Sequence, residues 1–320
     1  MLKTNTMEKD SPHDIQQSSV RSIGQPEFSP YLPTELVIDI FVHGCELSTE
    51  ISLALSQVST WARKIALPYV YQTVVIKNHA TKQAFAKTLN QRSIQAPHPD
   101  FRPKDYVQSL WLEAVSNRTL TIFSSCDNLV NLALPADNMM WLVYSSSPAS
   151  SANVMSMLPP RTITRKKDLH VLILNAKNPK WSLRNNVSNN PAHTSPFFAK
   201  VTHLRIGLVG PYSTHLDLAH FTRLTHIAVP YHQPEDQNLS DLLRVFDFPA
   251  TVFLVVVLLR DMLSDTQYQK AIDWVRQTRV TNPKVYVVTS RHSDLQSEWE
   301  EEVRRGFSIW DKAEITSRML

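Results

Sequence analysis

The stretches VTHLRI (201–206) and LTHIAV (224–229) share one pattern, in which apolar residues occupy the first, fourth and sixth positions. Neighbouring copies of this pattern begin between 22 and 40 residues apart. Self-similarity at such spacing predicts repeated units that bury their apolar faces against one another. The other copies are VQSLWL (107–112), LVNLAL (129–134), LHVLIL (169–174), VFLVVV (252–257) and a partial one, VYVVTS (285–290).

Each copy is short enough to form one β-strand, and the residues between copies leave room for a helix or an irregular return. We therefore expect a stack of parallel strands. The two longest intervals are explained by inserted polar loops at 145–160 and 185–196. Towards the end of the chain, the pattern predicts a helix over 264–279 capped by Ser264. A second helix is expected over 293–306, capped by Ser293 and ended by Gly306.

Residues 105–312 therefore resemble a degenerate leucine-rich repeat, because the shortest intervals match the period of that family. The resemblance implies an irregular α/β solenoid with parallel strands and a concave face that binds a protein. An α/β fold that is not a true solenoid is the alternative.

The N-terminal region predicts a compact helical unit over 30–76, after a disordered tail at 1–28. Pro33 suits the first position of a helix, because its missing N–H would have no partner there. The predicted elements are helices at 33–43 and 49–59, a third helix that holds Trp61 and stops before LPYVY (67–71), and a strand at 72–76. The third helix is expected to stop because residues before a proline avoid helical geometry. A linker helix is expected within 77–104, at about 81–91.

The segments LPTELVIDIF (32–41) and LSQVSTWARKIALPYVY (55–71) together resemble an F-box domain, especially the divergent F-box-like units of fungal proteins. The resemblance implies docking on a Skp-type adaptor of a cullin–RING ubiquitin ligase. The residues that would form the adaptor face are Leu32, Pro33, Leu36, Ile40 and Phe41. The alternative is that they pack only within the unit and against the next domain. Trp61 is interpreted as a core residue.

Residues between the repeated apolar positions should face the concave surface, because side chains alternate along a strand. This assignment gives Ser109 and Trp111, Asn131 and Ala133, Val171 and Ile173, His203 and Arg205, and His226 and Ala228. His203 and His226 occupy equivalent positions and should lie about 5 Å apart on paired strands. They could be solvated strand residues, part of a substrate-contact patch with Trp111, Asn131 and Arg205, or a metal-binding or pH-sensing pair.

Composition excludes several classes of protein. The chain is 42% hydrophobic and 19% charged, so it can bury a core, and its net charge of +4 over 320 residues argues against nucleic acid as a partner. Two distant cysteines and the absence of a signal core or an apolar run of spanning length predict a cytoplasmic or nuclear protein without a membrane anchor. Five scattered glycines provide no phosphate loop, dinucleotide fingerprint or nucleophile elbow.

The overall prediction is an α+β protein: a small N-terminal three-helix F-box-like unit followed by the repeat domain. We expect a non-catalytic substrate-recognition subunit of a Skp–cullin-type ubiquitin ligase, with no cofactor, no metal site and an unknown protein substrate. The first alternative is a repeat-type interaction scaffold without ligase recruitment. The second is an α/β enzyme whose site carries no recognisable motif.

Overall fold

The computed structural model describes residues 32–90, 101–146, 167–175, 195–208, 218, 220–232, 238–248 and 250–320. The predicted tail at 1–28 and most of the predicted loops at 145–160 and 185–196 lie outside these residues.

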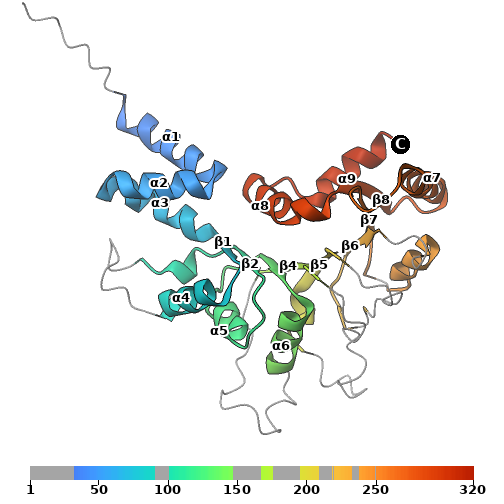
Figure 1. The fold of residues 1–320 in the computed structure, drawn as a ribbon, viewed down its shortest axis with the longest axis horizontal. Coiled ribbons are helices and arrows are strands. Elements are labelled where there is room, and N and C mark those ends of the chain that lie inside the picture. The colour runs from blue at the N-terminus through green and yellow to red at the C-terminus, as the bar shows by residue number, and fades with distance from the viewer. Residues whose placement is uncertain are drawn as a thin grey trace, which may run out of the picture.

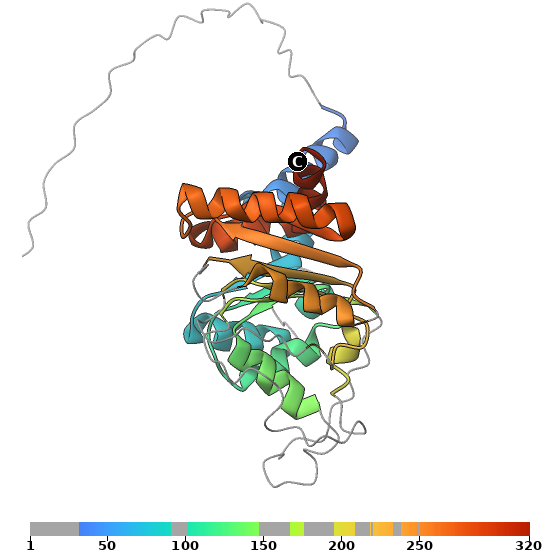
Figure 2. The same cartoon turned by 90° about the vertical axis from the view of Figure 1, so that its right-hand side faces the viewer.

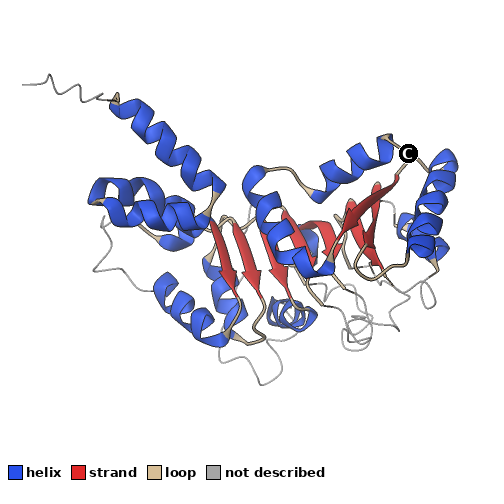
Figure 3. Ribbon diagram, turned by 45° about the horizontal axis from the view of Figure 1, so that its top comes forward, coloured by secondary structure: helices blue, strands red, loops and turns tan. Residues whose placement is uncertain are grey.

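An eight-stranded sheet forms the centre of the molecule, and all its strands are parallel and follow chain order. Figure 3 shows the strands side by side, with the N-terminal helices at one end. The predicted parallel stack is thus confirmed. The strands are β1 (Thr73–Ile76), β2 (Ser109–Leu112), β3 (Asn131–Leu134), β4 (Leu169–Ile173), β5 (Val201–Ile206), β6 (His226–Tyr231), β7 (Phe253–Leu259) and β8 (Val285–Ser290).

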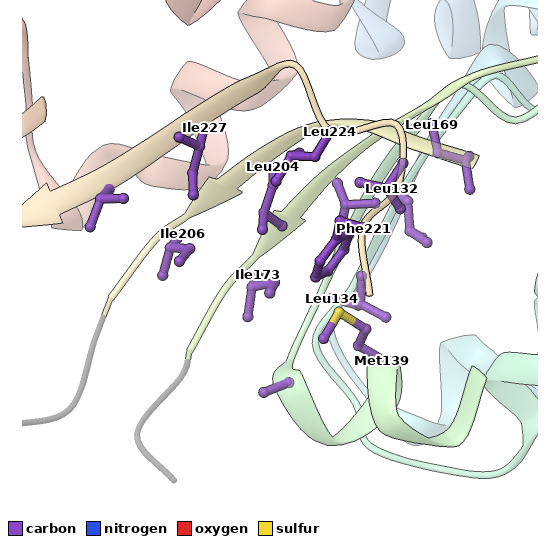
Figure 4. Close-up of a cluster of buried hydrophobic side chains, with 14 of the residues drawn as sticks. Leu132, Leu134, Met139, Leu169, Ile173, Leu204, Ile206, Phe221, Leu224 and Ile227 are labelled. Atoms are coloured by element: carbon purple, nitrogen blue, oxygen red, sulfur yellow. The ribbon is translucent and has the colours of Figure 1, made fainter. Parts of the chain in front are cut away.

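The main core lies on one face of the sheet, where the repeated apolar positions pack against helices and loops. Figure 4 shows Leu132, Ile173, Leu204 and Ile227 from successive strands in this layer, together with Phe221. The helices of this side are α4 (His79–Asn90), α5 (Arg118–Ser125), α6 (Ala136–Ser146), α7 (Asp265–Thr281) and the 3₁₀ segments η6 (Phe198–Lys200) and η7 (Leu239–Asp247).

Helices α8 (Leu295–Arg305) and α9 (Ile309–Arg318) cover the opposite face of the sheet. In Figures 1 and 2 they lie on the other side of the strands from α5 and α6. Trp299 of α8 packs near Ala133 and Leu172, and Ile309 of α9 packs near Val257. The strand β7 is therefore buried on both faces, as its uninterrupted apolar run predicts.

Two features of the chain allow these last helices to fold back. Gly306 ends α8 with a φ of 69°, a left-handed conformation that glycine adopts without steric cost. Ser308 then starts α9 with a capping box, in which its hydroxyl accepts the N–H of Asp311. At the outer edge of the sheet, the Ser317 hydroxyl accepts the N–H of Val287 at 2.9 Å, so α9 satisfies part of the edge strand.

The predicted start of α8 at Ser293 is wrong. Residues His292–Asp294 form a 3₁₀ turn, η8, and the helix begins at Leu295 without a side-chain cap. The Asp261 carboxylate accepts the backbone N–H groups of His292 and Ser293 at 3.1 and 3.3 Å, which stabilises this turn. By contrast, Ser264 caps α7 as predicted, with a complete capping box.

Three helices precede the sheet: α1 (Thr34–Leu47), α2 (Thr49–Val58) and α3 (Thr60–Gln72). Ser48 and Ser59 cap the second and third by accepting the N–H groups of Glu50 and Ala62.

The predicted end of the third helix before Pro68 is wrong, because α3 runs through this proline and leads directly into β1. Proline removes its own hydrogen bond to the preceding turn and its ring crowds the carbonyl four residues earlier, so a helix that continues through it needs support from packing. The buried Ala62 and Ala66, and the packing of Tyr71 against the main core, hold the helix on both sides of that gap.

Candidate functional site

A row of neighbouring rings crosses the face of the sheet that α8 and α9 cover. The register places His170, His203, His226 and Phe253 beside one another on β4 to β7. Their ring centroids are separated by 4.0, 4.1 and 4.9 Å in that order, and Phe253 stacks further on Tyr286 at 3.9 Å. We refer to His170, His203, His226, Phe253 and Tyr286 as the ring ladder. The expected neighbourhood of His203 and His226 is confirmed.

His170 is the member that sequence reasoning missed. The predicted outward positions on β4, Val171 and Ile173, are wrong, because both lie in the main core beneath the sheet. Leu169 and His170 pair with Val201 and His203, so the register with β5 shifts by one residue and the predicted outward positions on β4 are one residue late. A recognisable signal exists: His-Val-Leu-Ile at 170–173 aligns with His-Leu-Arg-Ile at 203–206 and His-Ile-Ala-Val at 226–229.

The histidines of the ladder are half-buried, which lowers the pKa of all three. The effect is largest at His203, where burial and then the neighbouring His170 and His226 lower the pKa to about 3. Asp168 and Glu314 partly oppose the shift at His170 and His226. The ladder is therefore a row of uncharged rings at neutral pH. The alternative of solvated strand histidines holds only in part, because these side chains are half-buried.

Threonine hydroxyls and a tryptophan hold the central rings in place. The Nδ1 atoms of His203 and His226 hydrogen-bond to Thr202 and Thr225 at 3.0 and 2.8 Å. Trp310 of α9 stands roughly perpendicular to both imidazoles, with its centroid 5.4 Å from each. Within the described residues, no three His, Cys, Asp or Glu side chains are grouped so that they could hold a metal ion.

Helix α8 buries two of the predicted contact residues. Trp111 is 3% exposed and packs against Trp299 at 5.4 Å between ring centroids. Arg205 is 5% exposed and forms ion pairs at 3.1 Å with both Glu298 and Glu302. Trp111 and Arg205 therefore attach α8 to the sheet and are not exposed to solvent.

Burial raises the pKa of Glu302, and the charges of Arg205 and Lys312 oppose that shift. Arg205 and Lys312 carry two positive charges, and Glu298 and Glu302 carry two negative charges. This group of side chains therefore has no net charge.

A cavity of about 320 Å³ lies between the ring ladder and the last two helices. This volume is at the lower end of the range typical of small-molecule sites. The cavity brings together Asn131, His203 and Arg205 of the predicted contact residues, and it adds His170. His226 and Trp111 do not line it. The remaining lining residues are Val130, Val171, Leu172, Trp299, Glu302, Val303, Gly306, Ser308, Ile309 and Trp310.

The second candidate site is the outer surface of the three N-terminal helices. Leu36 and Ile40, one turn apart on α1, are 49% and 58% exposed, and Leu32 and Pro33 just before them are also exposed. Phe41 is half-buried and packs on Trp61 at 5.5 Å. The interpretation of Trp61 as a core residue is wrong, because this side chain is 41% exposed.

The interior of this helical unit is made of small side chains. The buried residues of α1 to α3 are Cys45, Ser52, Ala62 and Ala66. Phe41, Leu55 and Ile65 are half-buried, and several other large apolar residues are exposed. Exposed apolar side chains grouped on one small unit are a feature of interaction sites. Those exposed over the unit are Leu32, Leu36, Ile40, Leu47, Ile51, Leu53, Val58 and Trp61.

Comparisons of this chain with models of protein families, with curated proteins and with solved structures give no match. A search of the described helices for length and hydropathy finds none that could cross a lipid bilayer.

Proposed function

We propose that this chain is a non-catalytic recognition subunit of F-box type, in which α1 to α3 bind a Skp-type adaptor of a cullin–RING ubiquitin ligase. The observation that carries the proposal is the exposed apolar surface of these helices, built around an interior of small residues. A unit with this many exposed large apolar side chains buries further apolar area when a partner covers them.

The choice of adaptor as partner rests on the F-box-like order of residues in 32–71. Four of the five residues that the resemblance assigns to the adaptor face, Leu32, Pro33, Leu36 and Ile40, are exposed. On this proposal, the repeat-like region holds a protein substrate and brings its lysines near the activated ubiquitin. The subunit then acts by raising local concentration, and no residue of this chain performs bond chemistry.

The experiment is a direct binding measurement between the purified full chain and the adaptor. Leu36→Asp combined with Ile40→Asp places two charges in the apolar surface without touching the interior of the unit. We expect a loss of affinity of about 100-fold or more, because central apolar contacts of an interface each contribute substantially.

The matched control is Val280→Asp combined with Met262→Asp, which charges two apolar residues exposed elsewhere, and it should bind like the parent. Circular dichroism checks that all forms are folded. No binding by the folded parent contradicts the proposal and leaves the interaction scaffold without ligase recruitment. Equal binding by both double variants would place the adaptor on another surface.

A further inference from the structure

The ring ladder stops abruptly at β4, although the row of side chains continues. Across the same row of the sheet, His170 pairs with Asn131 on β3, and Asn131 pairs with Ser109 on β2. On one side, the His170 ring packs on His203 with 4.0 Å between centroids and an interplanar angle of 46°. The next position along the ladder therefore holds a short amide where a ring could continue the stack, and neighbouring strands are about 4.8 Å apart.

The cavity described above lies at this end of the ladder. His170 and Asn131 line it together with the aromatic side chains of Trp299 and Trp310. Its volume of about 320 Å³ is large enough for a ligand of one or two rings. With His203, four aromatic rings line this space. They favour a planar ligand, since aromatic rings stack or meet edge to face.

Polar atoms of Asn131 and His170 can hydrogen-bond to a ligand in the cavity. The Asn131 side chain donates from Nδ2 to the Ser109 hydroxyl at 3.1 Å. Within the described part of the chain, the Oδ1 atom of Asn131 and both ring nitrogens of His170 form no hydrogen bond. The cavity thus offers an amide oxygen as acceptor, beside an imidazole that can donate or accept.

The charged side chains around the cavity favour an uncharged ligand. The charge of Arg205 is paired with those of Glu298 and Glu302, and Glu302 also lies 3.7 Å from Lys312. Burial keeps the neighbouring imidazoles neutral at physiological pH. A ligand with a net charge would find no unpaired counter-charge among these side chains and would lose its hydration on entry.

We propose that this cavity binds a planar, uncharged ring that carries an N–H or O–H donor, stacked on His170 with its donor directed to Asn131 Oδ1. The ring could belong to a free small molecule or to a tryptophan or tyrosine side chain of a bound protein, since both present the same chemistry. The proposal does not depend on adaptor binding, because α1 to α3 contribute no residue to the cavity.

The test uses indole as probe for a free ring and N-acetyltryptophanamide as probe for a side chain. Nuclear magnetic resonance of the full chain follows the ring C–H signals of the histidines, with His170 assigned by its loss in His170→Gln. We expect a saturable upfield shift of the His170 signals with a Kd at or below about 1 mM. Cyclohexanol, which is of similar size but neither planar nor aromatic, should leave them unchanged.

Asn131→Phe would add a ring at the vacant position of the ladder and fill the site, so we expect indole to bind at least about ten-fold more weakly. Asn117→Phe places the same side chain at an exposed position outside the cavity and should bind like the parent. Binding of indole alone assigns the site to small molecules, and binding of both probes admits an aromatic side chain. No saturable shift with either probe, or full binding by a folded Asn131→Phe variant, overturns the proposal.

Discussion

The three imidazoles of the ring ladder should make the stability of the protein depend on pH. The pKa of His203 is about 3 in the folded chain and 6.5 ordinarily. Between these values the unfolded chain binds more protons than the folded one, so the free energy of unfolding decreases as the pH falls below 6.5. Glu302, whose pKa is raised, contributes in the opposite direction at lower pH.

His203→Phe should keep a ring in the stack and remove its titration. We expect chemical denaturation at pH 7 and pH 5 to show a smaller loss of stability in this variant than in the parent. One histidine can account for a difference of at most about 1.4 kcal/mol per pH unit. Equal losses in the two proteins would mean that His203 does not carry the pH dependence.

A second buried polar group fixes the loop after β2. The Asn138 amide donates to the Ala114 carbonyl at 3.0 Å and accepts from the Ser116 N–H and the Thr119 hydroxyl at 3.1 and 3.0 Å. The ammonium group of Lys82 donates to the same carbonyl and the same hydroxyl, at 2.7 and 2.5 Å. Burial lowers the pKa of Lys82 to about 8.

Asn138→Ala should therefore destabilise the protein by about 2–3 kcal/mol, because it leaves buried polar groups unpaired and opens a cavity. Urea unfolding measures the effect. The control Asn117→Ala changes an exposed asparagine whose side chain forms no cap hydrogen bond, and it should cost less than about 0.5 kcal/mol. Similar costs for the two variants would show that the amide network does not stabilise the fold.

Among the secondary-structure elements, the turn between α8 and α9 decides whether the two helices can cover the sheet. A side chain at Gly306 would meet no atom within 4 Å, so a substitution there is opposed only by the positive φ of 69°. Gly306→Ala should cost about 1–2 kcal/mol in urea unfolding, and Gly306→Asn should cost less, because asparagine tolerates left-handed geometry. A neutral Gly306→Ala substitution would mean that the turn can adopt another conformation.

The elements differ in how far they could be predicted. The strands follow from their apolar alternation, and their parallel order follows from the repeat. The side-chain direction on β4 was predicted wrongly because the repeat was aligned one residue late there, and an offset of one residue reverses every side chain. Helix α8 was predicted from its amphipathic pattern and α9 was not, and periodicity does not tell which face of the sheet a helix covers. The burial of Trp111 and Arg205 was missed for that reason.

At the scale of the whole molecule, the described residues form two surfaces with different roles in our proposals. The sheet face is largely covered by α8 and α9, which leave the cavity beside His170. The N-terminal helices keep an uncovered apolar surface at the start of the sheet. Our proposals assign adaptor binding to α1 to α3 and ring binding to the cavity over the sheet. A substitution in one of these regions should therefore leave the other function unchanged.

Hydrogen exchange of the full chain with and without the Skp-type adaptor, read by mass spectrometry, tests the central claim most directly. The helices α1 to α3 bury few residues on their own and should exchange readily in the free protein. We predict that the adaptor slows exchange within residues 32–72 and leaves β2 to β8 unchanged. Slowing confined to the sheet, or no slowing at an adaptor concentration that saturates binding, would contradict docking through the N-terminal helices.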